Sequence, residues 1–145
     1  MAMKSLICAA AVLSGLLGCA TPRAFAVPCN GGSCNVDVHI ENCVITAPDI
    51  DNTGANNIFW NIDNASKQAG YTFAAGAAGV TLKTPPPSGC MAAGGVFDSP
   101  DRQNDFKFKL HNKGTLGTYC YAVKVVNTTT TPPQTCTLDP QIVNH

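Results

Sequence analysis

The fold is decided by residues 106–125, FKFKLHNKGTLGTYCYAVKV. In 106–111, Phe106, Phe108 and Leu110 alternate with two lysines and a histidine, and apolar residues alternate again from Tyr119 to Val125. A period of two places alternate side chains on opposite faces of a strand, so each run predicts a strand with one buried face. The segment 112–118 between them contains two glycines and predicts a connection.

The same pattern recurs in shorter runs elsewhere in the chain. We expect further strands at 36–41, 58–62, 71–73, 80–82 and 135–143, with a break at Pro140, and one helical turn at 64–70. Residues rich in Gly, Pro, Asp and Asn separate the runs, and 47–57 is predicted to be a turn region. Many short strands with such turns favour an all-β fold, an antiparallel two-sheet β-sandwich.

Length and charge limit the function classes. The 145 residues contain nine basic and nine acidic side chains, and only 12% of the chain is charged. Without excess positive charge, a nucleic-acid partner is not expected. Residues 27–145 are sufficient for a single domain, in which we expect 27–35 to form an N-terminal arm rich in Cys and Gly.

The first 26 residues resemble a secretory signal peptide. Lys4 precedes an uncharged apolar run from Leu6 to Leu17, too short to span a bilayer, and Ala24-Phe25-Ala26 fits a cleavage signal before Val27. Alternatives are an uncleaved anchor and a lipoprotein, since Leu16-Leu17-Gly18-Cys19 resembles a lipobox that would place a lipid on Cys19. We therefore expect a bacterial protein that is secreted or periplasmic, or alternatively an outer-membrane lipoprotein, with no later membrane span.

Six cysteines follow the leader. They are Cys29, Cys34, Cys43, Cys90, Cys120 and Cys136. An even number in an exported chain predicts three disulfides, and the sequence leaves 15 possible pairings. Cys29 and Cys34 enclose Asn-Gly-Gly-Ser, which would allow either a local ring or two separate links to the body of the domain.

Residues 58–62 (IFWNI), 71–73 (YTF) and 117–123 (GTYCYAV) resemble the cupredoxin-like group of β-sandwiches, and an immunoglobulin-like sandwich fits them almost as well. The first resemblance implies a possible copper site, for which the family supplies Cys, His and Met from one loop. Cys120 is followed by neither His nor Met, and the three histidines (His39, His111 and His145) are scattered. We therefore expect no copper and no cofactor.

Two acidic segments contain candidate binding residues. Asp49, Asp51, Thr53 and Asn57 match ligand positions of a calcium loop, but Trp60 stands where a bidentate Glu is needed. The stretch predicts a weak calcium site or an Asx-rich turn. Three carboxylates and one Arg in 98–105 are expected to form a solvated loop, because no catalytic motif accompanies them.

These patterns predict a non-catalytic module with a binding, inhibitory or structural role. Rigid β-sandwiches commonly carry specificity in their loops, here 48–57, 84–89 and 98–104, and the expected partner is a protein or a glycan. Trp60 is predicted to anchor the core. Two alternatives remain: a metal-binding (copper or weak calcium) redox or envelope protein, and a self-assembling surface component that pairs through exposed strand edges.

Overall fold

The computed structural model describes residues 26–145. Cys19 and most of the predicted signal peptide lie outside the described residues. The strands are β1 (Val27–Glu41), β2 (Val44–Thr46), β3 (Ile50–Ile62), β4 (Tyr71–Phe73), β5 (Val80–Leu82), β6 (Asp101–Asn104), β7 (Lys107–Asn112), β8 (Gly117–Asn127), β9 (Gln134–Leu138) and β10 (Gln141–Asn144). A single helical turn, α1 (Asn64–Gln68), and a 3₁₀ turn, η1 (Gly76–Ala78), complete the fold. The predicted all-β class is confirmed.

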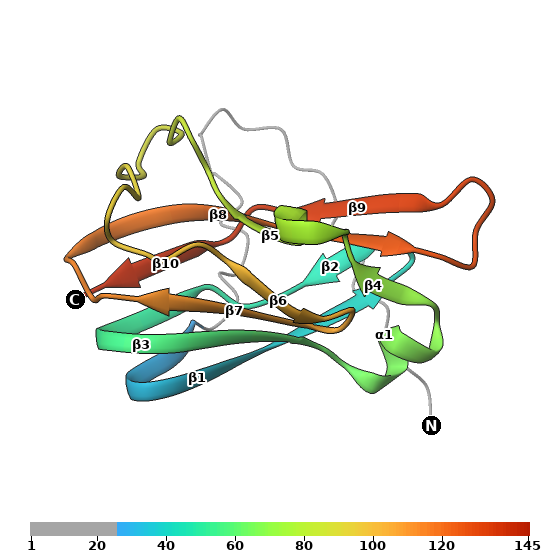
Figure 1. Cartoon of the computed structure of the whole chain (residues 1–145), viewed down its shortest axis with the longest axis horizontal. Helices are drawn as coiled ribbons and strands as arrows, with labels where there is room; N and C mark the ends of the chain where they lie inside the picture. The colour runs from blue at the N-terminus through green and yellow to red at the C-terminus, as the bar shows by residue number, and fades with distance from the viewer. Residues whose placement is uncertain (1–25) are drawn as a thin grey trace, which may run out of the picture.

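The strands form one hydrogen-bonded network. On one side of the core lie β2, β1, β3, β7 and β6, and on the other side β8 pairs with β4, β5 and β9 (Figure 1). β10 joins the two sides, because it pairs with the start of β3 and also with the start of β8. The sheet therefore curls nearly into a barrel and does not separate cleanly into two sheets.

The expectation of purely antiparallel pairing is wrong. β1 runs parallel to β3 along almost its whole length, from Val27↔Ile50 to Val38↔Ile62. β10 is also parallel to β3, whereas its pairing with β8 is antiparallel. The connection from β1 to β3 includes the short strand β2, which pairs with the end of β1. The chain then enters β3 at Ile50, beside Val27 at the beginning of β1.

Two segments predicted to lie outside strands are strands. The arm 27–35 is the first half of β1, and residues 50–57 of the predicted turn region are the first half of β3. These halves pair with each other, with an irregularity between Asn30 and Gly32. Backbone hydrogen bonds across this pair hold Gly- and Asn-rich sequence in strands that local propensity disfavours. Pro140 separates β9 from β10, as predicted.

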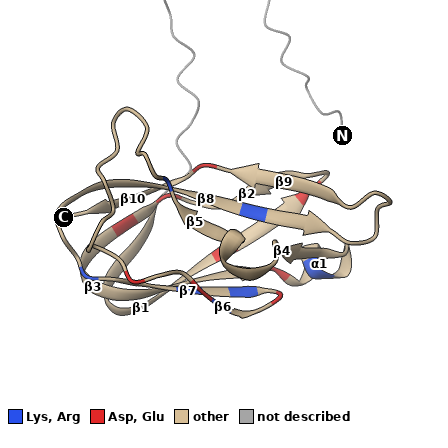
Figure 2. Ribbon diagram, turned by 45° about the horizontal axis from the view of Figure 1, so that its top comes forward, with Lys and Arg blue, Asp and Glu red and all other residues tan. Residues whose placement is uncertain are grey.

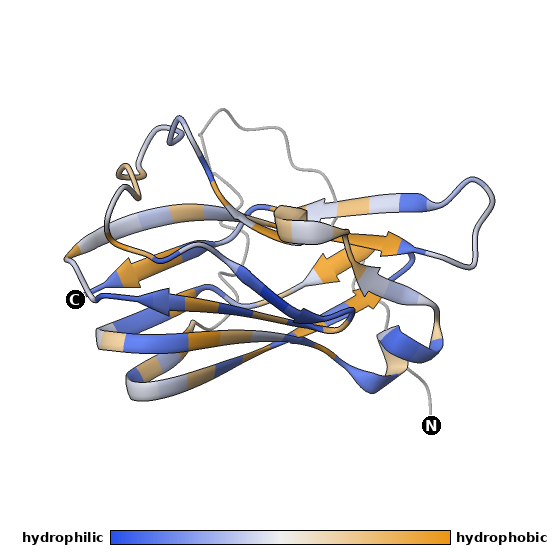
Figure 3. Ribbon diagram, in the orientation of Figure 1, coloured by the Kyte–Doolittle hydropathy of each residue, from blue (hydrophilic) through white to orange (hydrophobic). Residues whose placement is uncertain are grey.

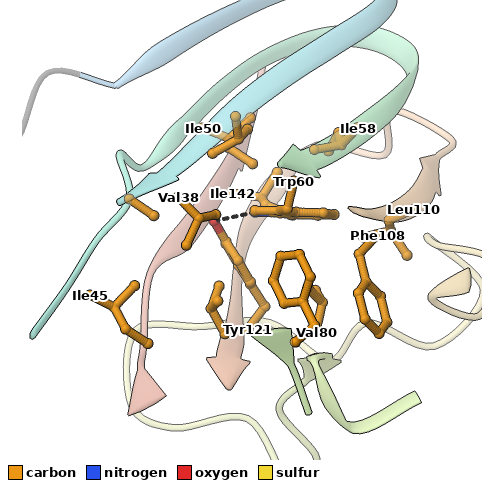
Figure 4. Packing of buried hydrophobic residues seen from close by; sticks show 14 of the residues in the cluster. Val38, Ile45, Ile50, Ile58, Trp60, Val80, Phe108, Leu110, Tyr121 and Ile142 are labelled. Atoms are coloured by element: carbon orange, nitrogen blue, oxygen red, sulfur yellow. Dashed lines mark hydrogen bonds between the residues drawn. The ribbon is translucent and has the colours of Figure 1, made fainter. Parts of the chain in front are cut away.

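Buried side chains alternate with half-buried ones along β7 and β8. Figure 3 shows hydrophobic and hydrophilic positions interspersed along the strands. Trp60 is fully buried between the two sides, and its indole Nε1 donates to the Tyr121 hydroxyl at 3.2 Å (Figure 4). Phe73 and Phe108 pack edge to face beside them, with ring centroids 5.0 Å apart. The prediction that Trp60 anchors the core is confirmed.

The six cysteines form three disulfides, as expected. Cys29 pairs with Cys34 in a local ring, Cys43 with Cys136, and Cys90 with Cys120, with Cα–Cα distances of 5.3, 5.3 and 5.6 Å. The second bond links the turn after β1 to β9, across the gap that the sheet leaves open. The third ties the long 83–100 connection to β8. Among the described residues, no helix is long and apolar enough to cross a membrane.

Candidate binding pocket

A pocket of about 500 Å³ lies at the end of β1, in the range typical of small-molecule sites. It is bounded by the end of β1, the turn that follows, α1, β4 and the last residue of β8. Its lining residues are His39, Ile40, Glu41, Asn42, Ala65, Ala69, Tyr71 and Asn127. Segments far apart in the sequence therefore build one concave surface.

The β1–β2 turn forms one wall. Glu41 pairs with Val44, and the two central residues, Asn42 and Cys43, both have positive φ (49° and 64°). Two such residues produce a tight hairpin turn of type I′ geometry, which Asn adopts readily but Cys does not. Cys43 is held there by its disulfide to Cys136, and its backbone N–H donates to the Tyr71 hydroxyl at 3.1 Å. The wall is thus fixed from two directions.

Helix α1 forms the opposite wall and is attached to β1 by a buried serine. Ser66 has no exposed surface, and its hydroxyl accepts from the Ile40 N–H at 2.7 Å and contacts the Ile40 carbonyl at 3.3 Å. Asp63 caps the helix, because its Oδ1 accepts from the Ser66 N–H at 2.7 Å. The apolar side chains of Ala65 and Ala69 are left facing the pocket.

His39 and Asp63 form an ion-pair contact at the rim, with His39 Nδ1 2.6 Å from Asp63 Oδ2. Burial opposes ionisation of Asp63, but hydrogen bonds from Ser66 and His39 and the charge of His39 outweigh it, so the pKa of Asp63 lies below its usual value. The contact engages Nδ1 and fixes the imidazole, and Nε2 has no hydrogen-bond partner within residues 26–145.

The polar groups at the rim of the pocket include a carboxylate, an imidazole and an amide. The Glu41 carboxylate offers acceptor oxygens, the Asn42 amide offers an oxygen and an NH₂ group, and His39 presents Nε2, while the alanines and Tyr71 supply apolar surface. Glu41 and Asn42 are exposed, so a ligand can reach them. The arrangement suits a small molecule that donates hydrogen bonds.

The weak calcium candidates have separate partners in the structure. Asp49 Oδ1 accepts from the Gln141 N–H at 2.9 Å, and Asp51 Oδ1 lies 2.9 Å from His145 Nε2. Thr53 is exposed on β3, and Asn57 Oδ1 lies 3.2 Å from His111 Nδ1. Residues 50–57 lie within β3, and around Gly54 (φ 77°) the Asn52 and Asn56 amides donate to backbone carbonyls, as in the predicted Asx-rich turn.

The residues considered for copper are also separate. Cys120 is bonded to Cys90, and His39, His111 and His145 contact Asp63, Asn57 and Asp51, respectively. In the described part of the chain, no group of three or more His, Cys, Asp or Glu side chains could hold a metal ion.

The two remaining candidate loops differ from expectation. Residues 101–104 of the predicted 98–104 loop form the edge strand β6, which pairs with β7. Asp98, Ser99 and Asp101 line a hollow of about 170 Å³ with Lys109 and His111. Residues 84–89 belong to the protruding connection fixed by Cys90 (Figure 1). Neither loop contributes to the larger pocket.

Sequence reasoning missed the pocket, because its walls meet only in the folded chain. One signal lies in the sequence: Asp63 directly precedes the predicted helical turn, and Asp is a favoured N-cap residue. No protein-family model matches this sequence, and no curated protein sequence matches it significantly.

Proposed function

We propose that this protein is an exported binding module that takes a small ligand rich in hydroxyl and amine donors into the pocket at the end of β1. The observation that carries the proposal is a concave site whose walls are fixed by a disulfide, a buried serine and a helix cap, while Glu41, Asn42 and Nε2 of His39 remain free to bind. Fixed walls lower the entropy cost of binding, so such a site gains affinity from few contacts.

Two features support action outside the cytoplasm. Three disulfides persist where the environment is oxidising, and the first 26 residues have the pattern of a cleaved signal peptide. Strands on two sides of the core support a sandwich-like description of the curled sheet. Parallel pairing of β1 with β3 favours the cupredoxin-like resemblance over an immunoglobulin-like one, whose sheets are antiparallel.

The proposal is tested by NMR with ¹⁵N-labelled protein and three probes: glucose, N-acetylglucosamine and glucosamine. We expect at least one probe to shift the amide signals of His39, Glu41 and Asn42 at millimolar concentration. Glu41→Gln should weaken that binding. Asp139→Asn serves as the matched control, because Asp139 is also an exposed carboxylate but pairs with Lys83 away from the pocket. The absence of shifts at the pocket with all three probes would refute the proposal.

A further inference from the structure

The outer face of β1, β3 and β7 carries a regular array of polar side chains. Residues that lie directly opposite one another on neighbouring strands point to the same side of a sheet. The residues that alternate with the buried ones therefore form three rows across these strands. The rows are Ser33–Asn57–His111, Asn35–Phe59–Lys109 and Asp37–Asn61–Lys107. All nine side chains are exposed or half-buried.

Amides and one aromatic ring dominate this array, which we call the outer polar face. Asn61 Nδ2 donates to Asn35 Oδ1 at 3.3 Å, and Asn57 contacts His111, so the amides of adjacent strands are already aligned. An amide offers both donors and an acceptor, which matches the two roles of a hydroxyl group. At the centre, Phe59 adds apolar surface of the kind on which a sugar ring can pack.

The charges on the outer polar face balance. Two lysines, Lys107 and Lys109, are offset by Asp37 on the face itself and by Asp101 on the adjacent edge strand β6, where Asp101 is the register partner of Lys109. Figure 2 shows acidic and basic positions interspersed on the ribbon. The Lys107 ammonium lies 4.5 Å from the Phe59 ring centroid, so a flexible side chain covers the ring. A balanced face suits a neutral ligand, because an anionic polymer needs an excess of cations.

The outer polar face continues into the pocket. Along β1, the outward positions after Asp37 are His39 and then Glu41, both of which line the pocket. From Ser33 to Glu41 the strand extends about 27 Å at the usual rise per residue, enough for several sugar units in a line. A ligand can therefore lie along the face and place one end in the pocket.

We infer that the ligand is a neutral linear glycan, which lies across the outer polar face and inserts its end into the pocket. This inference rests on the proposed function and specifies its ligand class. Phe59 packs against one sugar ring after Lys107 moves aside, and Asn35, Asn57 and Asn61 bind hydroxyl groups on either side. Glu41 accepts hydrogen bonds from the terminal sugar, and Nε2 of His39 contacts one of its hydroxyl groups.

The test uses full-length secreted protein and three hexasaccharides: a cellulose-type and a chitin-type chain, both neutral, and a galacturonate chain as the anionic comparison. We expect a neutral chain to shift amide signals on β1, β3 and β7 as well as at the pocket. Phe59→Ala should weaken its binding about tenfold, and Asn35→Ala, on an exposed position, should weaken it severalfold. Leu116→Ala is the control, because Leu116 is an exposed hydrophobic residue (67%) outside this array.

The outcomes separate the two proposals. If monosaccharides shift the pocket but neither neutral chain shifts the outer polar face, the glycan inference is refuted and the pocket stands. If a chain shifts the face but Glu41→Gln has no effect, the pocket proposal fails. Binding of the galacturonate chain alone, or equal losses in Phe59→Ala and Leu116→Ala, would overturn the glycan inference.

Discussion

The disulfide between Cys43 and Cys136 should be the largest covalent contribution to stability. It closes the longest loop of the three, with a sequence separation of 93, compared with 5 for Cys29–Cys34. Chain entropy makes the stabilisation grow with the logarithm of loop length. The long loop gives about 4.6 kcal/mol and the short one about 2.1 kcal/mol at 25 °C. The double variant C43A/C136A should therefore lose more stability than C29A/C34A.

The two double variants are matched in local geometry and in the atoms that they remove. Both disulfides have the same Cα–Cα distance of 5.3 Å, and both variants remove two sulfur atoms. The constant part of the entropy cancels, so the difference between the variants should be about 2.5 kcal/mol. Urea unfolding of the two oxidised double variants and the parent measures it. Equal losses, or a greater loss in C29A/C34A, would refute the loop-length reasoning.

Three further predictions concern single side chains. Tyr121→Phe leaves the buried Trp60 N–H without its acceptor and should cost about 1–3 kcal/mol in urea unfolding; no change would mean that the indole finds another partner. Ser66→Ala removes the hydroxyl that binds the Ile40 backbone and should cost about 1–3 kcal/mol, whereas Ser33→Ala, on an exposed residue, should cost little. Because the folded-state pKa of Asp63 is lowered, its contribution to stability is present above the usual value of 3.8 and is lost as the pH falls through the folded pKa. The free energy of unfolding should therefore decline in this acidic range less steeply for Asp63→Asn than for the parent, and identical slopes would contradict the role of the Asp63 contacts.

The strands that could be predicted are those whose side chains alternate strongly. In β7 and β8 the buried face is apolar and the other face polar, so local sequence and tertiary packing agree. The first half of β3 has no such alternation. These residues, Asp51 to Gly54, favour turns locally, and pairing with the parallel neighbours β1 and β10 places them in a strand.

For the candidate site too, the local sequence indicated exposure of a side chain but not its long-range contacts. The alternation in β1 indicated that His39 faces solvent, and its side chain is 47% exposed. Its contact with Asp63 joins residues 24 positions apart and follows from the position of α1 against β1. The choice among 15 disulfide pairings likewise depends on which strands become neighbours, and spacing along the chain does not specify it.

The position of β10 has a consequence for how the chain folds. Ile142 pairs with both Ile50 and Tyr119, so strands from the beginning, the end and the later middle of the domain meet at one place. Contacts between residues so far apart in the sequence form slowly, because distant segments must meet before any of them is stabilised. Until Gln141–Asn144 docks, the first residues of β3 and β8 lack this partner and are open to pairing with other chains. Nascent or refolding protein should therefore be most prone to aggregation just before this last short strand is in place.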